Sequence, residues 1–253
     1  LYASLDKNGE LTLSSREIPN TDITLNNFLK IDLIKTPSTS DSGFIGLEYS
    51  KEPEYRNQIK TINIKDKITL TSCRDLFANL ENLTTIKNIE NLDTSKCESM
   101  YAMFANCENL TSVALNSLDT HNVEDMACMF RECNSLETLD LSSFNLSSVK
   151  TMQEMFWKMR NIKEIKFNDI YAKFLAKNVK NYSYMFDGCS KLEKINIYPL
   201  VFNSDVDTTN MFKETANLKT IIVNDNSNFD SSLVSDTVNI IKVDNAIGGV
   251  DIE

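Results

Sequence analysis

A repeating unit of about 26 residues constrains the fold of this 253-residue chain more than any other feature. Six phenylalanines recur at spacings of 27, 26, 26, 30 and 26 residues, and leucine or isoleucine stands six residues after each of them. Five of the six directly follow a methionine. A single unit of this size cannot bury its own apolar face, so the repetition predicts stacked coils that share one core. The phenylalanines are Phe77, Phe104, Phe130, Phe156, Phe186 and Phe212.

The spacing of apolar residues changes within each unit. In one unit, five apolar residues are separated by 3, 3, 1 and 3 positions, which is typical of one face of a helix. The three that follow have the Leu-x-x-Leu-x-Leu spacing of a short strand in a leucine-rich repeat. We therefore predict an α/β repeat, a right-handed leucine-rich-repeat solenoid of five to six coils with a parallel β-sheet on one face. The residues of this unit are Val123, Met126, Met129, Phe130 and Cys133 for the helix, and Leu136, Leu139 and Leu141 for the strand.

Two blocks of the repeat carry a family resemblance. Residues 118–126 read Leu-Asp-Thr-His-Asn-Val-Glu-Asp-Met, and residues 133–141 read Cys-Asn-Ser-Leu-Glu-Thr-Leu-Asp-Leu. Together with the Met-Phe pair between them, these blocks resemble the repeat of BspA-like leucine-rich repeat surface proteins of bacteria. The resemblance extends from about Cys73 to Val223, and it implies the solenoid fold and adhesion to host or neighbouring-cell components. One unit is four residues longer than the others, and the pattern also changes at Leu146, Met159 and Thr215.

The repeat divides the chain into three regions. Residues 1–71 precede it and are predicted to form an N-terminal β-rich cap, in which Asn8-Gly9 is the two-residue turn of a β-hairpin. Residues 72–223 form the solenoid, and residues 224–253 are a closing segment with an acidic tail. Further strands of the cap are expected at residues 44–49, 59–64 and 68–71.

Charge and hydropathy exclude several classes of partner. The chain has 26 lysines and arginines against 36 acidic residues, and this net charge of −10 repels phosphate backbones and anionic lipid headgroups. No stretch approaches the roughly 18 apolar residues of a membrane-spanning helix. We therefore expect neither nucleic-acid binding nor membrane insertion. Because the sequence begins with Leu1, we expect any export signal to lie outside it.

Most of the six cysteines are predicted to be buried thiols rather than halves of disulfides. Three occupy one column of the repeat. Cys73 aligns with methionines of other units, and Cys97 aligns with valines. Neighbouring coils lie about 5 Å apart, so a bridge within that column is expected to be possible only between two of its members. The three column residues are Cys107, Cys133 and Cys189, of which the first two could be bridged.

Cys128 and His121 are predicted to lie at the surface. Cys128 shares its column with Asp75, Ala102 and Glu154, and His121 stands where other units have serine. A single histidine and the lack of any Cys-x-x-Cys argue against a zinc site and against a catalytic triad. We expect no catalytic residue, metal or cofactor.

Two groups of residues are candidates for partner binding. Charged residues at exposed strand positions alternate in sign from coil to coil, which favours stacking pairs as well as a binding face. Trp157, the only tryptophan, stands at a nominally exposed position, either as an aromatic plug beneath the longer unit or as an interface anchor. The candidates are Glu137, Lys163, Lys166 and Lys194 on the strands, and Trp157, Tyr171, Phe174 and Tyr184 around the longer unit.

The resemblance implies a non-enzymatic bacterial protein, on the cell surface or secreted, that binds a protein or glycan and is expected to be a monomer. Two alternatives remain open. One is a structural spacer on the cell surface, and the other is the binding domain of a larger enzyme or toxin.

Overall fold

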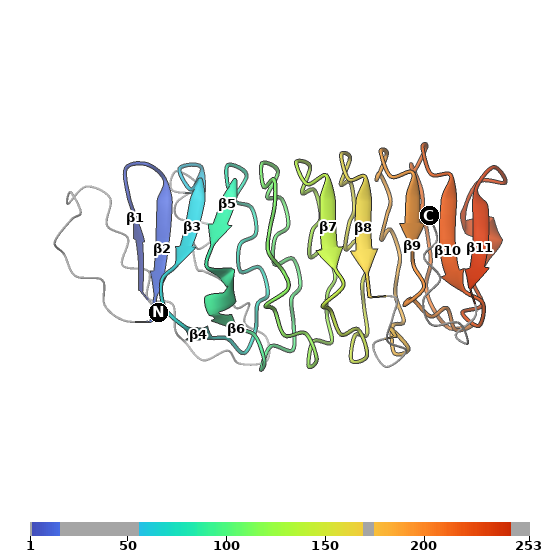
Figure 1. Ribbon diagram of the computed structural model, residues 1–253, viewed down its shortest axis with the longest axis horizontal. Helices are drawn as coiled ribbons and strands as arrows, with labels where there is room; N and C mark the ends of the chain where they lie inside the picture. The colour runs from blue at the N-terminus through green and yellow to red at the C-terminus, as the bar shows by residue number, and fades with distance from the viewer. Residues whose placement is uncertain (1, 16–55, 169–174, 244–253) are drawn as a thin grey trace.

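The structure, a computed structural model, describes residues 2–15, 56–168 and 175–243, and it is an elongated stack of coils (Figure 1). The first strand and the last strand lie at opposite ends of the stack. Within these residues the structure has two single turns of 3₁₀-helix, η1 at Ile89–Asn91 and η3 at Ser231–Leu233. The strands are β1 Tyr2–Leu5, β2 Glu10–Ser14, β3 Thr61–Ile64, β4 Ile68–Thr69, β5 Thr85–Lys87, β6 Leu92–Asp93, β7 Thr138–Leu141, β8 Glu164–Phe167, β9 Lys194–Asn196, β10 Thr220–Asn224 and β11 Asn239–Val243.

Strands of successive coils pair in parallel, as the repeat predicts. Strands β2, β3 and β5 form one parallel group, β7 and β8 a second, and β9, β10 and β11 a third, while the short strands β4 and β6 pair separately. The register joins equivalent positions, for example Leu139 with Ile165 and Ile195 with Ile221. Residues 111–115 occupy the corresponding place in their coil but do not form a strand. The sheet is therefore divided into sections and is not the continuous sheet that the sequence led us to expect.

The first two strands form an antiparallel hairpin, which packs at the start of the stack. Its loop runs from Asp6 to Gly9, so the prediction of a two-residue turn at Asn8-Gly9 was wrong. The carboxylate of Asp6 accepts hydrogen bonds from the backbone N–H groups of Asn8 and Glu10, both at 2.8 Å. The Asp6 side chain stabilises the longer loop, because its carboxylate accepts hydrogen bonds from N–H groups that would bond to backbone carbonyls in a tighter turn. The strand expected at residues 44–49 lies outside the described residues.

The segment that contains each Met-Phe pair is a series of turns, and the prediction of a helix there was wrong. Its backbone bonds to the next coil: the N–H of Phe104 donates to the carbonyl of Met129, and that of Phe130 donates to the carbonyl of Met155, both at 2.9 Å. Residues with positive φ stand two positions on either side of each phenylalanine, all of them non-glycine except Gly188, and an α-helix does not accommodate them. Apolar spacing alone could not reveal this, because consecutive turns bury residues at nearly the same intervals as a helix.

Stacked phenylalanine rings form the centre of the core, as the repeat predicts. All six repeat phenylalanines are at most 5% exposed. Consecutive ring centroids lie 5.2–6.1 Å apart, and the planes of Phe104, Phe130 and Phe156 are within 9° of parallel. The offset-stacked range of aromatic pairs is about 4.5–7 Å, so each of the four inner rings is packed on two sides by repeat phenylalanines of adjacent coils. Because every coil depends on both of its neighbours, the core has the character of a one-dimensional stack.

Asparagine side chains hold neighbouring coils together at the surface. The amide group of one asparagine in a coil donates to a backbone carbonyl of the preceding coil, and the same bond recurs along the stack at 2.6–2.9 Å. These bonds satisfy carbonyls that the turns leave free, which explains why a chain with only 6 glycines and 4 prolines can form so many turns. The donors are Asn82, Asn109, Asn161 and Asn217.

Candidate functional site

Four of the predicted binding residues, Glu137, Lys163, Lys166 and Lys194, lie on the exposed face of strands β7 to β9 or directly before these strands, and we call this face the strand surface. Lys163 donates to Glu137 at 2.8 Å, and this hydrogen bond lowers the pKa of Glu137. Both side chains are more than half exposed, so the pair contributes little to stability. Lys166 and Lys194 are exposed, and within the described residues neither lies within 4.0 Å of a carboxylate. The strand surface thus combines weak stacking pairs with exposed lysines that form no ion pair within the described residues.

Trp157 is the centre of a second surface, formed by the turns around the Met-Phe pairs. Its indole ring is half-buried, and its N–H donates to a carboxylate oxygen of Asp187 in the next coil at 3.0 Å. The guanidinium carbon of Arg131 lies 4.2 Å from the ring centroid and the ammonium nitrogen of Lys158 lies 3.8 Å from it. These distances are well inside the roughly 6 Å limit of cation–π contact. The ring is therefore held by groups from three consecutive coils.

The cation above Trp157 is itself fixed in place. Arg131 donates to the carboxylate of Glu154 at 2.6 Å, and the Glu154 side chain is only 20% exposed. An arginine that is bonded on one side and stacked on the other loses much of its rotamer freedom before any partner arrives. Trp157 and Arg131 thus form a prearranged pair.

A similar pair occurs two coils earlier in the same row of turns. The guanidinium carbon of Arg74 lies 3.8 Å from the ring centroid of Tyr101, and its nitrogens lie 3.7 Å from carboxylates of Asp75 and Asp125. Burial raises the pKa of both of these aspartates, although the positive charge of Arg74 opposes the shift. We call the whole row the turn surface, defined by Arg74, Tyr101, Cys128, Arg131, Trp157, Lys158 and Asp187.

The prediction that Cys128 is exposed was wrong. Its side chain is 8% exposed and packs in a small cluster with Ala102, Ala105 and Ala127. Burial raises the pKa of the thiol, and the negative charge of Glu154 adds to the effect. The backbone of Cys128 has φ 58°, a conformation that the sequence columns do not show.

The other predicted residues of this region are placed as follows. Tyr184 is half-buried with φ 59° and accepts, through its carbonyl, a hydrogen bond from the backbone N–H of Asp187 at 3.2 Å. It therefore begins the turn that carries the partner of Trp157. Tyr171 and Phe174 lie outside the described residues, so the proposed plug beneath the longer unit stays a prediction.

Sequence reasoning missed the partners of Trp157, although a signal for two of them was present. Arg131, Trp157 and Asp187 occupy the same column of consecutive units, and stacking brings equivalent positions of adjacent coils together. In this column, Arg131 comes one unit before Trp157 and Asp187 comes one unit after it, so the column predicts both neighbours of the indole. Lys158 follows Trp157 in the chain and has φ 56°, a backbone conformation that the column does not reveal.

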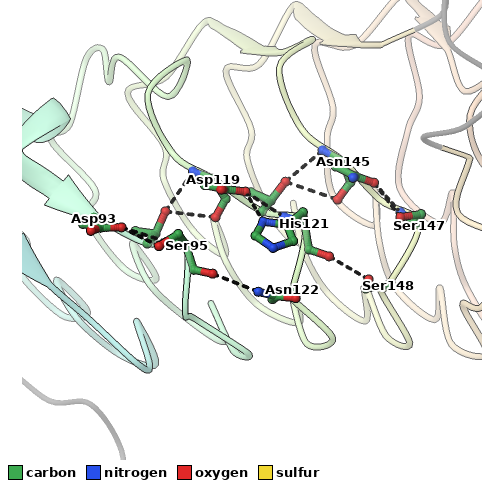
Figure 2. A network of polar contacts seen from close by, with 10 residues as sticks. Asp93, Ser95, Asp119, His121, Asn122, Asn145, Ser147 and Ser148 are labelled. Carbon is green, nitrogen blue, oxygen red and sulfur yellow. Dashed lines mark hydrogen bonds and ion pairs between the residues drawn. The ribbon is translucent and has the colours of Figure 1, made fainter.

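A third set of polar residues lies along the loops between coils (Figure 2). Thr94 and Thr120 are buried, and each bonds both the N–H and the carbonyl of one residue in the next coil. His121 lies in one of these loops, as predicted, and its Nδ1 is 2.6 Å from a carboxylate oxygen of Asp119. The same oxygen accepts from the backbone N–H of His121 at 3.1 Å. This pattern is that of a local turn-stabilising bond.

Two aspartates of these loops have lowered pKa values. Hydrogen bonds from the side chain and backbone of Ser95 lower the pKa of Asp93 to about 2. Partial burial acts to raise the pKa of Asp119, but hydrogen bonds and charge from His121 outweigh it and the pKa is lowered. Both carboxylates are thus engaged in holding their own turns, which assigns this network to the stability of the loops.

Within residues 2–15, 56–168 and 175–243, no three histidine, cysteine or acidic side chains are grouped as a metal ion would require. Among the helices in the described part of the chain, none is long and apolar enough to cross a membrane.

Comparison with known proteins gives a family. No curated protein matches the sequence. A solved leucine-rich repeat protein from Bacteroides ovatus ATCC 8483 is similar at 16% identity over 74% of this chain and 70% of that chain, with a TM-score of 0.23. The profile of a family described as "Mycoplasma protein of unknown function, DUF285" matches residues 71–194 and 158–246, which together are well over half of the chain. The chain therefore belongs to the DUF285 family of Mycoplasma proteins of unknown function.

Proposed function

We propose that this chain is a non-enzymatic binding module that recognises a protein or glycan through the turn surface, acting as a monomer on a bacterial cell surface or in secreted form. The observation that carries the proposal is the arrangement around Trp157: a half-buried indole with a cation 4.2 Å from its centre and its N–H bonded to a buried carboxylate. Tryptophan and arginine are the residues most enriched at the energetic centres of interfaces.

The rigidity of the turn surface supports the proposal. Trp157 and Arg131 are fixed by bonds to Asp187 and Glu154, so binding costs little side-chain entropy at these positions. The lysines of the strand surface have the opposite character, since Lys166 and Lys194 are exposed. Ordering a free lysine on binding costs on the order of 1 kcal/mol, which offsets much of what a single surface charge contributes.

The parallel strand pairs and the Leu-x-x-Leu-x-Leu spacing support placing these coils among the right-handed leucine-rich-repeat solenoids. Solenoids of this kind offer extended, preformed surfaces and bind their partners through them. The net charge of −10 supports a partner that is neither nucleic acid nor an anionic membrane.

The test is binding of the purified chain to immobilised extracellular-matrix proteins and to a glycan array, with three variants alongside. Trp157→Ala is expected to weaken saturable binding at least tenfold, the size of effect that a central interface aromatic produces. Trp157→Phe keeps a ring but loses the N–H, so its effect is expected to be smaller. Lys194→Ala, on the strand surface, is the matched control and is expected to bind as the parent does.

Two results contradict the proposal. Binding that is weakened by Lys194→Ala and unaffected by Trp157→Ala places the site on the strand surface. If the chain shows no saturable binding to any of the extracellular-matrix proteins or glycans, the result favours a structural spacer on the cell surface.

A further inference from the structure

Cys73 and Cys97 are the only cysteine pair whose sulfur atoms meet within the described residues. Their Sγ atoms lie 2.7 Å apart, and both residues are fully buried in the main core. A disulfide bond is about 2.05 Å long, so the atoms are roughly 0.7 Å from bonding distance and far inside an ordinary sulfur–sulfur contact. The sequence columns had pointed instead to Cys107 and Cys133 as the pair that could be bridged.

The cysteines of the repeat column behave differently. The thiols of Cys107, Cys133 and Cys189 each lie 3.1–3.2 Å from the carbonyl of the phenylalanine in the preceding coil, which accepts their S–H. These sulfurs are occupied as hydrogen-bond donors in three equivalent positions. Cys97 lies 3.4 Å from the carbonyl of Leu70, and its much closer neighbour is the other sulfur. The column thiols are therefore a built-in comparison for the Cys73–Cys97 pair.

The position of the pair in the fold is also distinctive. In the three coils that follow each residue, the equivalent positions hold methionine in place of Cys73 and valine in place of Cys97. The first junction between coils thus has two sulfurs at positions that the next three junctions fill with a methionine and a valine. The pair joins the coil that carries β4 to the coil that carries β6, at the boundary between the cap and the regular repeat.

We propose that Cys73 and Cys97 are a redox pair that a small-molecule disulfide oxidises to a disulfide bond, which links the first coil of the stack covalently to the second. The thiolate of one cysteine attacks a sulfur of the small disulfide, forms a mixed disulfide and releases one small thiol. The thiolate of the other cysteine then attacks the protein sulfur of the mixed disulfide, and the second small thiol leaves. The protein loses two electrons and two protons, and the small disulfide gains them as two thiols.

Burial determines when this reaction takes place. The hydrogen bond between the two sulfurs and their burial raise the pKa of Cys73, and the thiolate is the reactive form. The reaction is therefore slow in the folded chain and proceeds while the first coil is open, during folding or local opening. Once formed, the bond is shielded from reductants by the same burial. The bond closes a loop of one coil and restricts the unfolded chain at the end of the stack.

The test is refolding from denaturant in a buffer of oxidised and reduced glutathione, followed by alkylation under denaturing conditions. Four of the six thiols are expected to be alkylated, and the mass of the chain is expected to fall by about 2 Da. Digestion with trypsin and a glutamate-specific protease is expected to yield residues 68–74 joined to residues 97–98. The melting temperature is expected to rise by roughly 5–10 °C over the reduced chain.

Three variants serve as controls. Cys97→Val and Cys73→Met place the residues of later coils at these positions, so both are expected to fold, to show no rise in melting temperature on oxidation and to keep all remaining thiols free. Cys107→Ala is expected to leave the cross-linked peptide in place. Six alkylated thiols in the refolded parent chain, or a cross-link between any other two cysteines, would overturn the proposal.

Discussion

The strand surface and the turn surface carry similar numbers of charges but use them differently. On the strand surface and at the adjoining start of β10, lysine and glutamate of neighbouring coils meet in pairs whose side chains are 55–69% exposed. On the turn surface, arginines lie on aromatic rings and bond to carboxylates that are 20–30% exposed. Exposed pairs compete with water at every moment, whereas half-buried groups hold one arrangement. A repeat can thus use exposed ion pairs between its coils on one face while half-buried groups keep another face rigid.

Both surfaces depend on the same phenylalanine core, so the largest effect should come from a change there. Phe130→Ala removes a fully buried ring that stacks on Phe104 at 5.3 Å and on Phe156 at 6.1 Å. The free energy of unfolding is expected to fall by about 3–5 kcal/mol, measured by urea denaturation. A nearly neutral change would show that the coils do not stack in the register described above.

The two surfaces should differ in what a lost cation costs. Arg131→Ala removes a stacked and bonded guanidinium, and the free energy of unfolding is expected to fall by about 1–2 kcal/mol. Lys163→Ala removes one half of an exposed pair, and the expected loss is at most about 0.5 kcal/mol. Urea denaturation of both variants in 0.1 M and 1 M salt is the measurement. Equal losses from the two variants would remove the distinction between the surfaces.

The smallest expected effects are opposite slopes of stability with pH. Burial raises the pKa of Asp125, the partner of Arg74 on the turn surface, so the folded chain holds this proton more tightly than the unfolded chain does. The contribution of Asp125 to stability therefore falls as the pH rises above about 4. Bonds from Ser95 lower the pKa of Asp93 to about 2, so its contribution is present above about pH 4 and is lost as the pH falls towards 2.

The measurement is the urea midpoint against pH for Asp125→Asn and Asp93→Asn. Asp125→Asn keeps an acceptor for the N–H of Ala127, so it removes the titration and the ion pair with Arg74 but not this hydrogen bond. Each variant is expected to flatten its own part of the profile. Identical profiles for the parent chain and both variants would show that neither carboxylate is perturbed as described.

The repeat register was predictable from sequence because each column is a contact. The spacing of the phenylalanines predicted their burial and stacking, and the shared column of Arg131, Trp157 and Asp187 held the neighbours of the indole. The local backbone was not predictable, because apolar spacing in the Met-Phe segment fits both a helix and a series of turns. Left-handed residues such as Ala102 and Cys128 decide between them, and neither residue type is typical of that conformation.

The contact between the sulfur atoms of Cys73 and Cys97 could not be predicted from the sequence either. Residues of one repeat column lie opposite one another in adjacent coils, so the columns indicated Cys107 and Cys133 as the pair that could be bridged. Cys73 and Cys97 belong to different columns, and their sulfur atoms meet in the core. Side-chain direction, which sequence columns do not encode, brings them together.

Trp157 is the only tryptophan, and its fluorescence therefore reports directly on the claim that the turn surface is the binding site. The measurement is a titration of the chain with the extracellular-matrix protein or glycan that binds most tightly in the arrays, following indole emission and its quenching by acrylamide. A saturable shift in emission with reduced quenching, at the concentrations where the ligand binds, is the result we predict. Saturable binding with unchanged emission and unchanged quenching would contradict the account, because the partner would then bind away from Trp157.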